Sequence, residues 1–292
     1  MDPQRSLTEH FEANRPRLRG VAYRLLGSLP EAEDAVQESW LRLGRTETAA
    51  IENLSGWLTT VVSRVCLDML RSRRSRREEP IGAEATETST ARGEGADPEG
   101  EALLADSVGV ALLVVLETLS PAERLAFVLH DLFAVPFEEI GPIVGRSPEA
   151  ARQLASRARR RVRGAPASAN ADGERRREVL EAFVRAVREG DLEGLLAVLD
   201  PEAVIRIDAA ASMSGEAREI RGAAAWAERF LAFSRELRFV QPALLDGSIG
   251  LIHAPRGKLS RVVMLGFGDD QVVQVEVIAD PARLRDLEIA VL

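Results

Sequence analysis

The chain has 292 residues, 46% of them hydrophobic, so it can build two or three domains with their own cores. It has one cysteine and three histidines, which excludes an internal disulfide and a cysteine-rich zinc site, and no metal or cofactor is expected. The formal net charge of −8 argues against nucleic-acid binding only if charge is evenly spread, and basic residues cluster at 71–77 and 147–164.

Residues 1–78 are predicted to form a helical domain. The segment PEAEDAVQESWLRL begins with Pro30 and an acidic first turn, as helix N-termini prefer. A second segment, SGWLTTVVSRVCLDMLRSRRSRR, follows a predicted N-cap at Ser55 and ends in arginines, which suit the C-terminal end of a helix dipole. Its Cys66 lies in an apolar helical context, so we expect a buried core residue rather than a redox group.

Composition divides the rest of the chain. Residues 79–102 are rich in Glu, Thr, Gly and Ala and cannot bury a core, which predicts a flexible acidic linker. A second helical domain is predicted over 103–164, a second linker over 165–173, and an α+β domain over 174–292. That last domain begins with two amphipathic helices broken at Gly190, and the segments AVIRID, SRVVMLGFG and QVVQVEVIA have the alternation of strands. No signal segment or membrane-length apolar run is evident, so we expect a cytoplasmic protein that does not enter membranes.

The stretch SPEAARQLASRARRRVRG, residues 147–164, is predicted to be the second helix of a helix-turn-helix. Ser147 is a good N-cap, Pro148 suits the first helical position, and Gly145 supplies the turn after PFEEIGPIV. One side of the helix is mostly alanine. The other side carries Arg, Gln and Ser, which suit base edges and phosphates. An ordinary helical hairpin with a solvated basic face is the alternative that this segment leaves open.

Three segments, taken in order, resemble an extracytoplasmic-function (ECF) sigma factor, the promoter-recognition subunit of bacterial RNA polymerase. EAEDAVQESWLRL resembles the region 2 helix that docks on the polymerase clamp. WLTTVVSRVCLDMLRSRRSRR resembles the helix that opens and reads the −10 element. The segment from LSPAERLAF to SRARRRVR resembles region 4, which reads the −35 element. The resemblance implies core polymerase as partner, through its β′ clamp and β flap, together with promoter DNA.

The resemblance carries over residue by residue. It places the polymerase contact on Asp34, Gln37, Glu38 and Leu41. It places −10 DNA on Ser63, Arg64, Leu67, Asp68, Arg71, Arg73 and Arg74. It places −35 DNA on Arg146, Ser147, Glu149, Arg152, Gln153, Ser156, Arg157 and Arg160. The arginines at 159, 161 and 163 are better suited to phosphates.

The C-terminal domain resembles a SnoaL-like domain of the NTF2-like cone fold, which a subgroup of ECF sigma factors carries. The ending ADPARLRDLEIAVL resembles that subgroup's terminal motif through Asp280, Pro281 and Leu284, so we expect a regulatory contact there. The sequence departs from two motifs of that subgroup. After the −10 helix, RREEPIG keeps only a Glu-Pro of the first motif. In the C-terminal domain, Asp208 is followed by AAASMSG instead of the residues of the second motif. A regulatory domain is therefore expected, with a small-molecule ligand left open. The alternative is a SnoaL-like enzyme fused to a DNA-binding segment, with Asp208 and His253 as its only candidate pair.

Overall fold

The computed structural model describes residues 3–46, 51–78, 109–164, 171–226, 240–268 and 270–292. These fall into two compact units, one within residues 1–108 and 116–159 and the other within 109–115 and 160–292. Among these described ranges, no helix is long and apolar enough to cross a membrane. The predicted linker at 79–102 lies outside the described residues. The predicted linker at 165–173 is described only at 171–173, which already belong to a helix.

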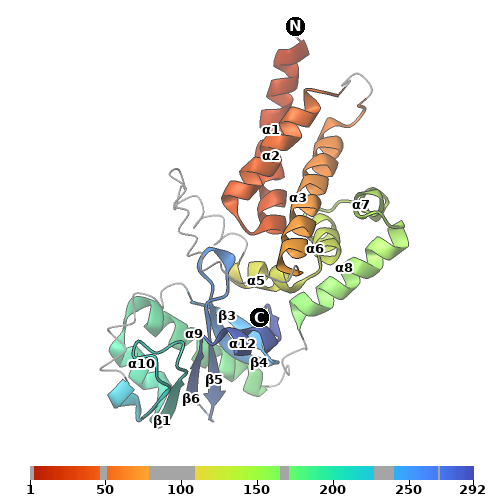
Figure 1. Ribbon diagram of the computed structural model, residues 1–292. Coiled ribbons are helices and arrows are strands. Elements are labelled where there is room, and N and C mark those ends of the chain that lie inside the picture. The colour runs from red at the N-terminus through yellow and green to blue at the C-terminus, as the bar shows by residue number, and fades with distance from the viewer. Residues whose placement is uncertain (1–2, 47–50, 79–108, 165–170, 227–239, 269) are drawn as a thin grey trace. The chain divides into compact units, whose positions relative to one another are not determined.

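The first unit begins with three helices that pack on one another, α1 (Pro3–Leu26), α2 (Leu29–Leu43) and α3 (Leu54–Glu78) (Figure 1). Pro30 lies in the first turn of α2, as predicted. The predicted N-cap at Ser55 is wrong. The helix begins at Leu54, and Asn53 Oδ1 accepts the backbone N–H of Gly56 at 3.0 Å, while the Ser55 hydroxyl bonds the Asn14 side chain. Asn is as good an N-cap residue as Ser, so residue type alone does not separate Asn53 from Ser55.

The second helical domain contains α5 (Val110–Thr118), α6 (Pro121–Phe127), the π-helical turn η2 (Val128–Leu132), α7 (Phe137–Val144) and α8 (Pro148–Arg163). A reciprocal capping box starts α6, where Ser120 and Glu123 bond each other's backbone N–H groups. Gly145 between α7 and α8 has φ of 69°, a left-handed conformation that glycine adopts without steric cost. The predicted helix-turn-helix is therefore present as α7 and α8, with Pro142 in the second turn of α7.

Residues 171–292, called the cone domain below, form the predicted α+β fold. Two helices, α9 (Ala171–Glu189) and α10 (Leu192–Val198), break at Gly190 as predicted, and Asp191 caps the second. The strands are β1 (Leu199–Ile207), β2 (Arg218–Arg221), β3 (Val240–Leu245), β4 (Ser248–His253), β5 (Arg261–Phe267), β6 (Val272–Ile278) and β7 (Ile289–Ala290). A short helix, α12 (Pro281–Asp286), lies between β6 and β7.

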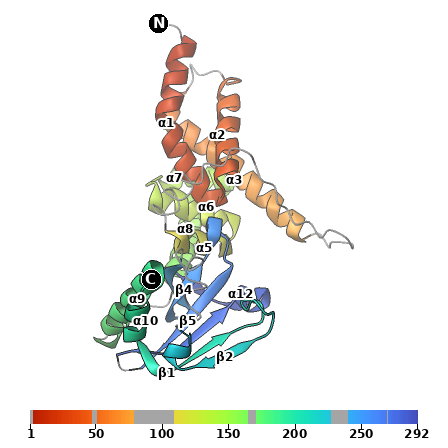
Figure 2. The ribbon, with the colours of Figure 1, turned by 90° about the vertical axis from the view of Figure 1, so that its left-hand side faces the viewer.

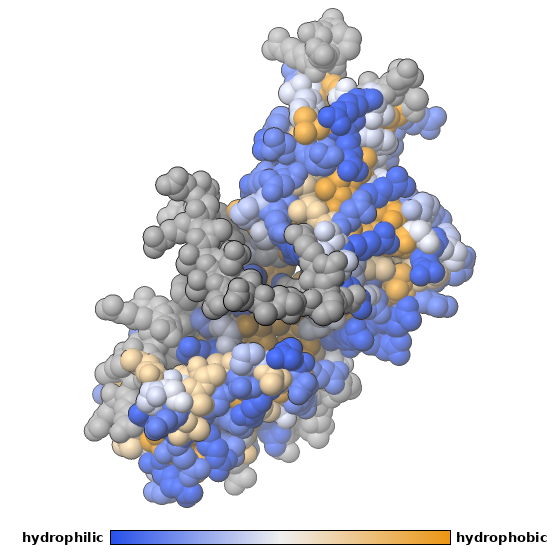
Figure 3. All heavy atoms as spheres, viewed as in Figure 1, coloured by the Kyte–Doolittle hydropathy of each residue, from blue (hydrophilic) through white to orange (hydrophobic). Residues whose placement is uncertain are grey.

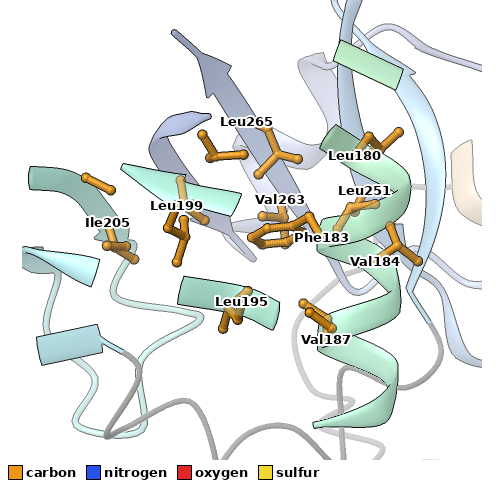
Figure 4. Packing of buried hydrophobic residues seen from close by; sticks show 14 of the residues in the cluster. Leu180, Phe183, Val184, Val187, Leu195, Leu199, Ile205, Leu251, Val263 and Leu265 are labelled. Atoms are coloured by element: carbon orange, nitrogen blue, oxygen red, sulfur yellow. The ribbon is translucent and has the colours of Figure 1, made fainter. Parts of the chain in front are cut away.

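The sheet of the cone domain runs in the order β2-β1-β6-β5-β4-β3-β7, and only the β1–β6 pair is parallel. Helices α9 and α10 lie against the sheet (Figure 2). Phe183 and Leu180 of α9 meet Leu251, Val263 and Leu265 of the central strands in one buried cluster (Figure 4). Each of these side chains removes enough apolar area from water to stabilise the fold by about 1.5–3 kcal/mol.

Candidate nucleic-acid interface

Helix α8 presents one polar and one buried side, as its sequence predicts. Ser147 Oγ accepts the backbone N–H of Ala150 at 3.3 Å, which confirms it as an N-cap. Ala151, Ala155 and Ala158 are fully buried, so small side chains let α8 pack closely inside its domain. All the residues predicted to face −35 DNA are exposed: Arg146, Ser147, Glu149, Arg152, Gln153, Ser156, Arg157 and Arg160. Figure 3 shows hydrophilic side chains along this helix.

Local partners orient some of the α8 side chains. The Arg152 guanidinium lies 5.3 Å from the centre of the Phe137 ring, a cation–π distance. Arg157 pairs with Glu123 at 3.4 Å while keeping about half of its side chain exposed. Arg159 differs, because it is half-buried and pairs with Asp131 at 2.6 Å. In this conformation Arg159 ties α8 to the end of η2 instead of facing solvent as a phosphate contact would.

The residues predicted for −10 DNA do not share one surface of α3. Arg64, Asp68, Arg71 and Arg74 are exposed. Ser63 and Leu67 are buried, which corrects their placement on a DNA-facing surface in this conformation. Arg73 is half-buried. Its guanidinium donates to the carbonyl of Leu26 at 3.1 Å and pairs with Glu31.

The correction on α3 has a physical reason. A helical wheel assumes one buried face, but α3 contacts α1 and α2 of its own domain and also α6 and α7 of the second helical domain. The buried positions therefore cover about two thirds of the helix circumference. They are Leu58, Thr59, Val61, Val62, Ser63, Val65, Cys66, Leu67 and Leu70. Burial also raises the pKa of the Cys66 thiol to about 12, as expected for an inert core cysteine.

Helix α2 carries the predicted polymerase contact. Asp34 and Gln37 are exposed, and Leu41 keeps 47% of its surface in solvent. Glu38 is half-buried and accepts a hydrogen bond from Arg42 Nε at 2.8 Å, one turn further along the helix. Leu41 is thus an exposed apolar side chain among acidic and amide groups.

The candidate catalytic pair of the cone domain is not brought together. Asp208 follows β1 and His253 ends β4, and β6 and β5 lie between these strands, a separation of about 14 Å. The Asp208 carboxylate accepts backbone N–H groups of Ala211, Ala279 and Asp280 at 2.7–2.9 Å. Burial favours the neutral acid, but these bonds outweigh it and lower the pKa of Asp208. Its role is to anchor the chain entering α12.

The predicted terminal motif lies at the start of α12. Asp280 caps α12 by accepting the N–H groups of Ala282 and Arg283, Pro281 is exposed, and Leu284 is half-buried. A residue beyond this motif contacts α8: the backbone N–H of Val291 donates a hydrogen bond to the carbonyl of Val162 at 2.8 Å.

Two more contacts within the same unit join the cone domain to the ends of the second helical domain. Gln241 Oε1 of β3 accepts the backbone N–H of Val110 at the start of α5, at 2.9 Å. Gly164 follows α8 with φ of 62°, and a Cβ placed there would lie 2.5 Å from that of Ala290. Both ends of the helical segment 110–163 are thus held by the β3–β7 edge of the sheet. No sequence signal marked Gln241, Gly164 or Val291.

Known proteins agree with this architecture. Residues 10–76 match the family model for Sigma-70 region 2, and residues 109–162 match the model for Sigma-70 region 4. The chain is 41% identical to the probable ECF RNA polymerase sigma factor SigI of Mycobacterium tuberculosis over 68% of its own length and 69% of the relative's. It is 43% identical to the ECF RNA polymerase sigma factor SigJ of the same species over 73% of its own length and 68% of the relative's.

Among solved structures, the crystal structure of Mycobacterium tuberculosis SigJ aligns with a TM-score of 0.45 and 34% identity, covering 95% of this chain and 98% of that one. The two sigma-region matches coincide with helices α1–α3 and α5–α8. With region 2, region 4 and relatives above 40% identity in place, the chain belongs to the ECF family of RNA polymerase sigma factors.

Proposed function

We propose that this sigma factor reads the −35 element with α8 and the −10 element with α3, while α2 docks on the β′ clamp of core polymerase. The observation that carries the proposal is the exposed polar row of α8, mounted on a buried alanine face in a helix-turn-helix. Such a helix enters the major groove with its N-terminal residues toward base edges. The protein then acts in the cytoplasm, with the polymerase and the chromosome.

On α8, the side chains divide by chemistry. Arg152 and Gln153 lie in the N-terminal half and suit bidentate contacts to guanine and adenine. Ser147 and Arg146 flank the helix start, where backbone N–H groups attract phosphate. Glu149 has its pKa lowered by hydrogen bonds from its own backbone N–H and from Ser147, so it is an anionic acceptor that suits cytosine N4.

On α3, the proposed DNA surface is the exposed arc that holds Arg64, Asp68 and Arg71, with Arg74 beyond it. Arginines here hold phosphates and position the helix. On α2, the acidic and amide groups around Leu41 suit a basic surface of the clamp, and region 4 contacts the β flap.

The cone domain regulates this activity by holding both ends of the region 4 segment. The Val291–Val162 hydrogen bond and the Gln241–Val110 hydrogen bond support this role. A small-molecule ligand for the cone domain stays a prediction. The enzyme alternative loses its support, because Asp208 is occupied by backbone N–H groups.

Gly164→Ala tests the regulatory role, because it forces a Cβ against Ala290. Gly215→Ala is the matched control. It has a similar φ of 71°, so it carries the same backbone strain, but open space surrounds its Cβ position. In reconstituted transcription with core polymerase, Gly164→Ala is expected to change the yield from a responsive promoter and Gly215→Ala to leave it unaltered. Equal yields from the two variants would contradict a regulatory contact at the end of α8.

A further inference from the structure

We propose that Phe137 is a positioning residue for −35 recognition, because its ring holds the Arg152 guanidinium ready to read a guanine. Phe137 lies outside the recognition helix, at the first position of α7. The inference rests on the proposed assignment of α8 to −35 DNA. It deepens that assignment by naming the base that Arg152 takes and the side chain that presents Arg152 to it.

The contact between Arg152 and Phe137 joins an exposed side chain to a buried one. The guanidinium lies 5.3 Å from the centre of the ring, and only 7% of the Phe137 surface is exposed. The positive charge is attracted to the negative π face of the ring. This attraction does not require an N–H donor to be given to an acceptor atom. The ring therefore orients Arg152 while its hydrogen-bonding capacity stays available to a ligand.

Two other arginines of α8 are held in a different way, by carboxylates. Arg157 pairs with Glu123 at 3.4 Å. Arg159 pairs with Asp131 at 2.6 Å. A carboxylate accepts the same N–H donors that a base edge or a phosphate accepts, so it competes with DNA for them. A bidentate contact to guanine O6 and N7 needs a pair of N–H donors. Arg152 is therefore better prepared for this contact than an arginine that is already paired with an acid.

The Phe137 ring is itself fixed by His130 of η2. The two ring centres are 3.8 Å apart, and the ring planes are inclined by 28°. The Nδ1 atom of His130 lies 3.1 Å from the carbonyl of Val135, and because a carbonyl can only accept, Nδ1 is the donor. The N–H groups of Ala134 and Val135 return to the carbonyls of His130 and Leu129, which closes this turn. The aromatic surface that faces the guanidinium is therefore held in place from two elements, η2 and α7.

Holding Arg152 before DNA arrives has an energetic consequence. An exposed arginine side chain has many rotamers, and a DNA contact that needs one of them must pay for the loss of the others. The ring reduces this loss at Arg152 alone. A purely structural role for Phe137, as a buried core residue, would instead affect the whole domain. A positioning role therefore predicts an effect on one base preference, whereas a structural role predicts an equal effect on all −35 sequences.

Selection from templates with a randomised −35 element, transcribed by core polymerase with the full chain, tests this inference. Arg152→Ala first identifies the −35 position at which a preference for guanine is lost. Phe137→Leu removes the ring and keeps apolar bulk. It should lower that guanine preference by about two- to tenfold and leave the other −35 positions unchanged. In the Arg152→Ala background, Phe137→Leu should have no further effect on this preference, because the ring then has no guanidinium to hold.

Phe133→Leu is the matched control. It also removes a ring with an arginine 5.3 Å from its centre, but that arginine is Arg24 of α1, so the guanine preference should not change. A ring-fluorinated phenylalanine at position 137 keeps the aromatic shape and weakens the negative charge of the ring face. It should lower the same preference, and it decides the matter if Phe137→Leu does not fold, as judged by circular dichroism.

The possible outcomes separate this inference from the proposed function. If Arg152→Ala changes selection but the folded Phe137 variants do not, only the positioning role is overturned. The positioning role is also overturned if Phe137→Leu weakens all −35 sequences equally, or if Phe133→Leu lowers the guanine preference as much. A preference lost in Arg152→Ala for a base other than guanine contradicts the assigned base. If Arg152→Ala alters no −35 position, the proposed base contact of Arg152 fails together with the inference.

Discussion

Helices α8 and α3 are assigned to the two halves of a promoter, yet they differ in how much of their polar surface is free. Every residue predicted for −35 DNA on α8 is exposed. On α3, Ser63 and Leu67 are buried and Arg73 caps the end of α1 through the Leu26 carbonyl. The difference follows from packing, because α8 buries one alanine-rich side whereas α3 contacts helices of both sigma regions.

The contrast shows that the same residue types can be ready for DNA on one helix and committed to structure on another. An arginine at the C-terminal end of a neighbouring helix satisfies carbonyls that would otherwise be unpaired. Arg73 and Arg124 both do this, at adjacent carbonyls of α1. Basic residues therefore predict DNA contacts only where the fold leaves them in solvent.

The largest expected difference between the helices is in thiol chemistry. Burial raises the pKa of Cys66 on α3 to about 12, so almost no thiolate exists at pH 8 and it forms only as the pH approaches 12. A thiol on the exposed side of α8, introduced as Ser156→Cys with Cys66→Ala, should react with iodoacetamide about a thousandfold faster at pH 8. Rates within tenfold of each other would show that α3 is open to solvent at Cys66.

Side-chain truncation gives the next largest effect. Leu67→Ala is expected to lower the free energy of unfolding by about 2–5 kcal/mol, because it leaves a cavity beneath a fully packed helix. Arg71→Ala, one turn further on the exposed arc, should change it by less than about 0.5 kcal/mol. Denaturant unfolding followed by circular dichroism measures both. A similarly small change in the free energy of unfolding for Leu67→Ala would show that the Leu67 side chain is exposed.

On α8, replacing an exposed arginine with alanine should affect promoter binding instead of stability. If Arg152 contacts a base edge, Arg152→Ala should weaken promoter binding by polymerase holoenzyme by about 1–3 kcal/mol and relax preference at one −35 position. An equal loss of affinity for all −35 sequences, with a weaker dependence of affinity on salt concentration, would identify a phosphate contact. Titrations at several salt concentrations separate the two cases for Arg152 and for Arg157. If neither variant changes promoter binding, the placement of α8 on the −35 element is wrong.

The smallest effect concerns the start of α8. Ser147→Ala removes the hydroxyl that accepts the Ala150 N–H and should destabilise the domain by about 1 kcal/mol. Ser156→Ala, on the exposed side of the same helix, serves as the control and should be close to neutral. Thermal unfolding of both variants measures the difference, and equal unfolding midpoints would show that Ser147 does not stabilise α8 as an N-cap.

Much of this fold could be predicted from the sequence wherever one local pattern decides the structure. The wheel of α8, the break at Gly190 and strands β1, β5 and β6 are of this kind. The burial of Ser63 could not be predicted, because the local pattern does not show that α3 packs against α1, α2, α6 and α7.

The same limit applies in the cone domain. The carboxylate of Asp208 is held by backbone groups 71 and 72 residues further along the chain, so its sequence neighbours gave no sign of an anchoring role. The two-residue strand β7 is too short for any alternation to mark it. Its contact with the end of α8 therefore appears only in the folded chain.

Promoter-specific transcription by core polymerase supplied with this chain tests the central claim most directly, using templates in which the −10 and −35 elements are randomised separately. The account predicts specific transcripts, with Arg152→Ala altering selection only in the −35 library and Arg64→Ala affecting only the −10 library. Specific transcripts whose selection in both libraries is unchanged by either substitution would contradict the assignment of α8 and α3 as the two promoter readers.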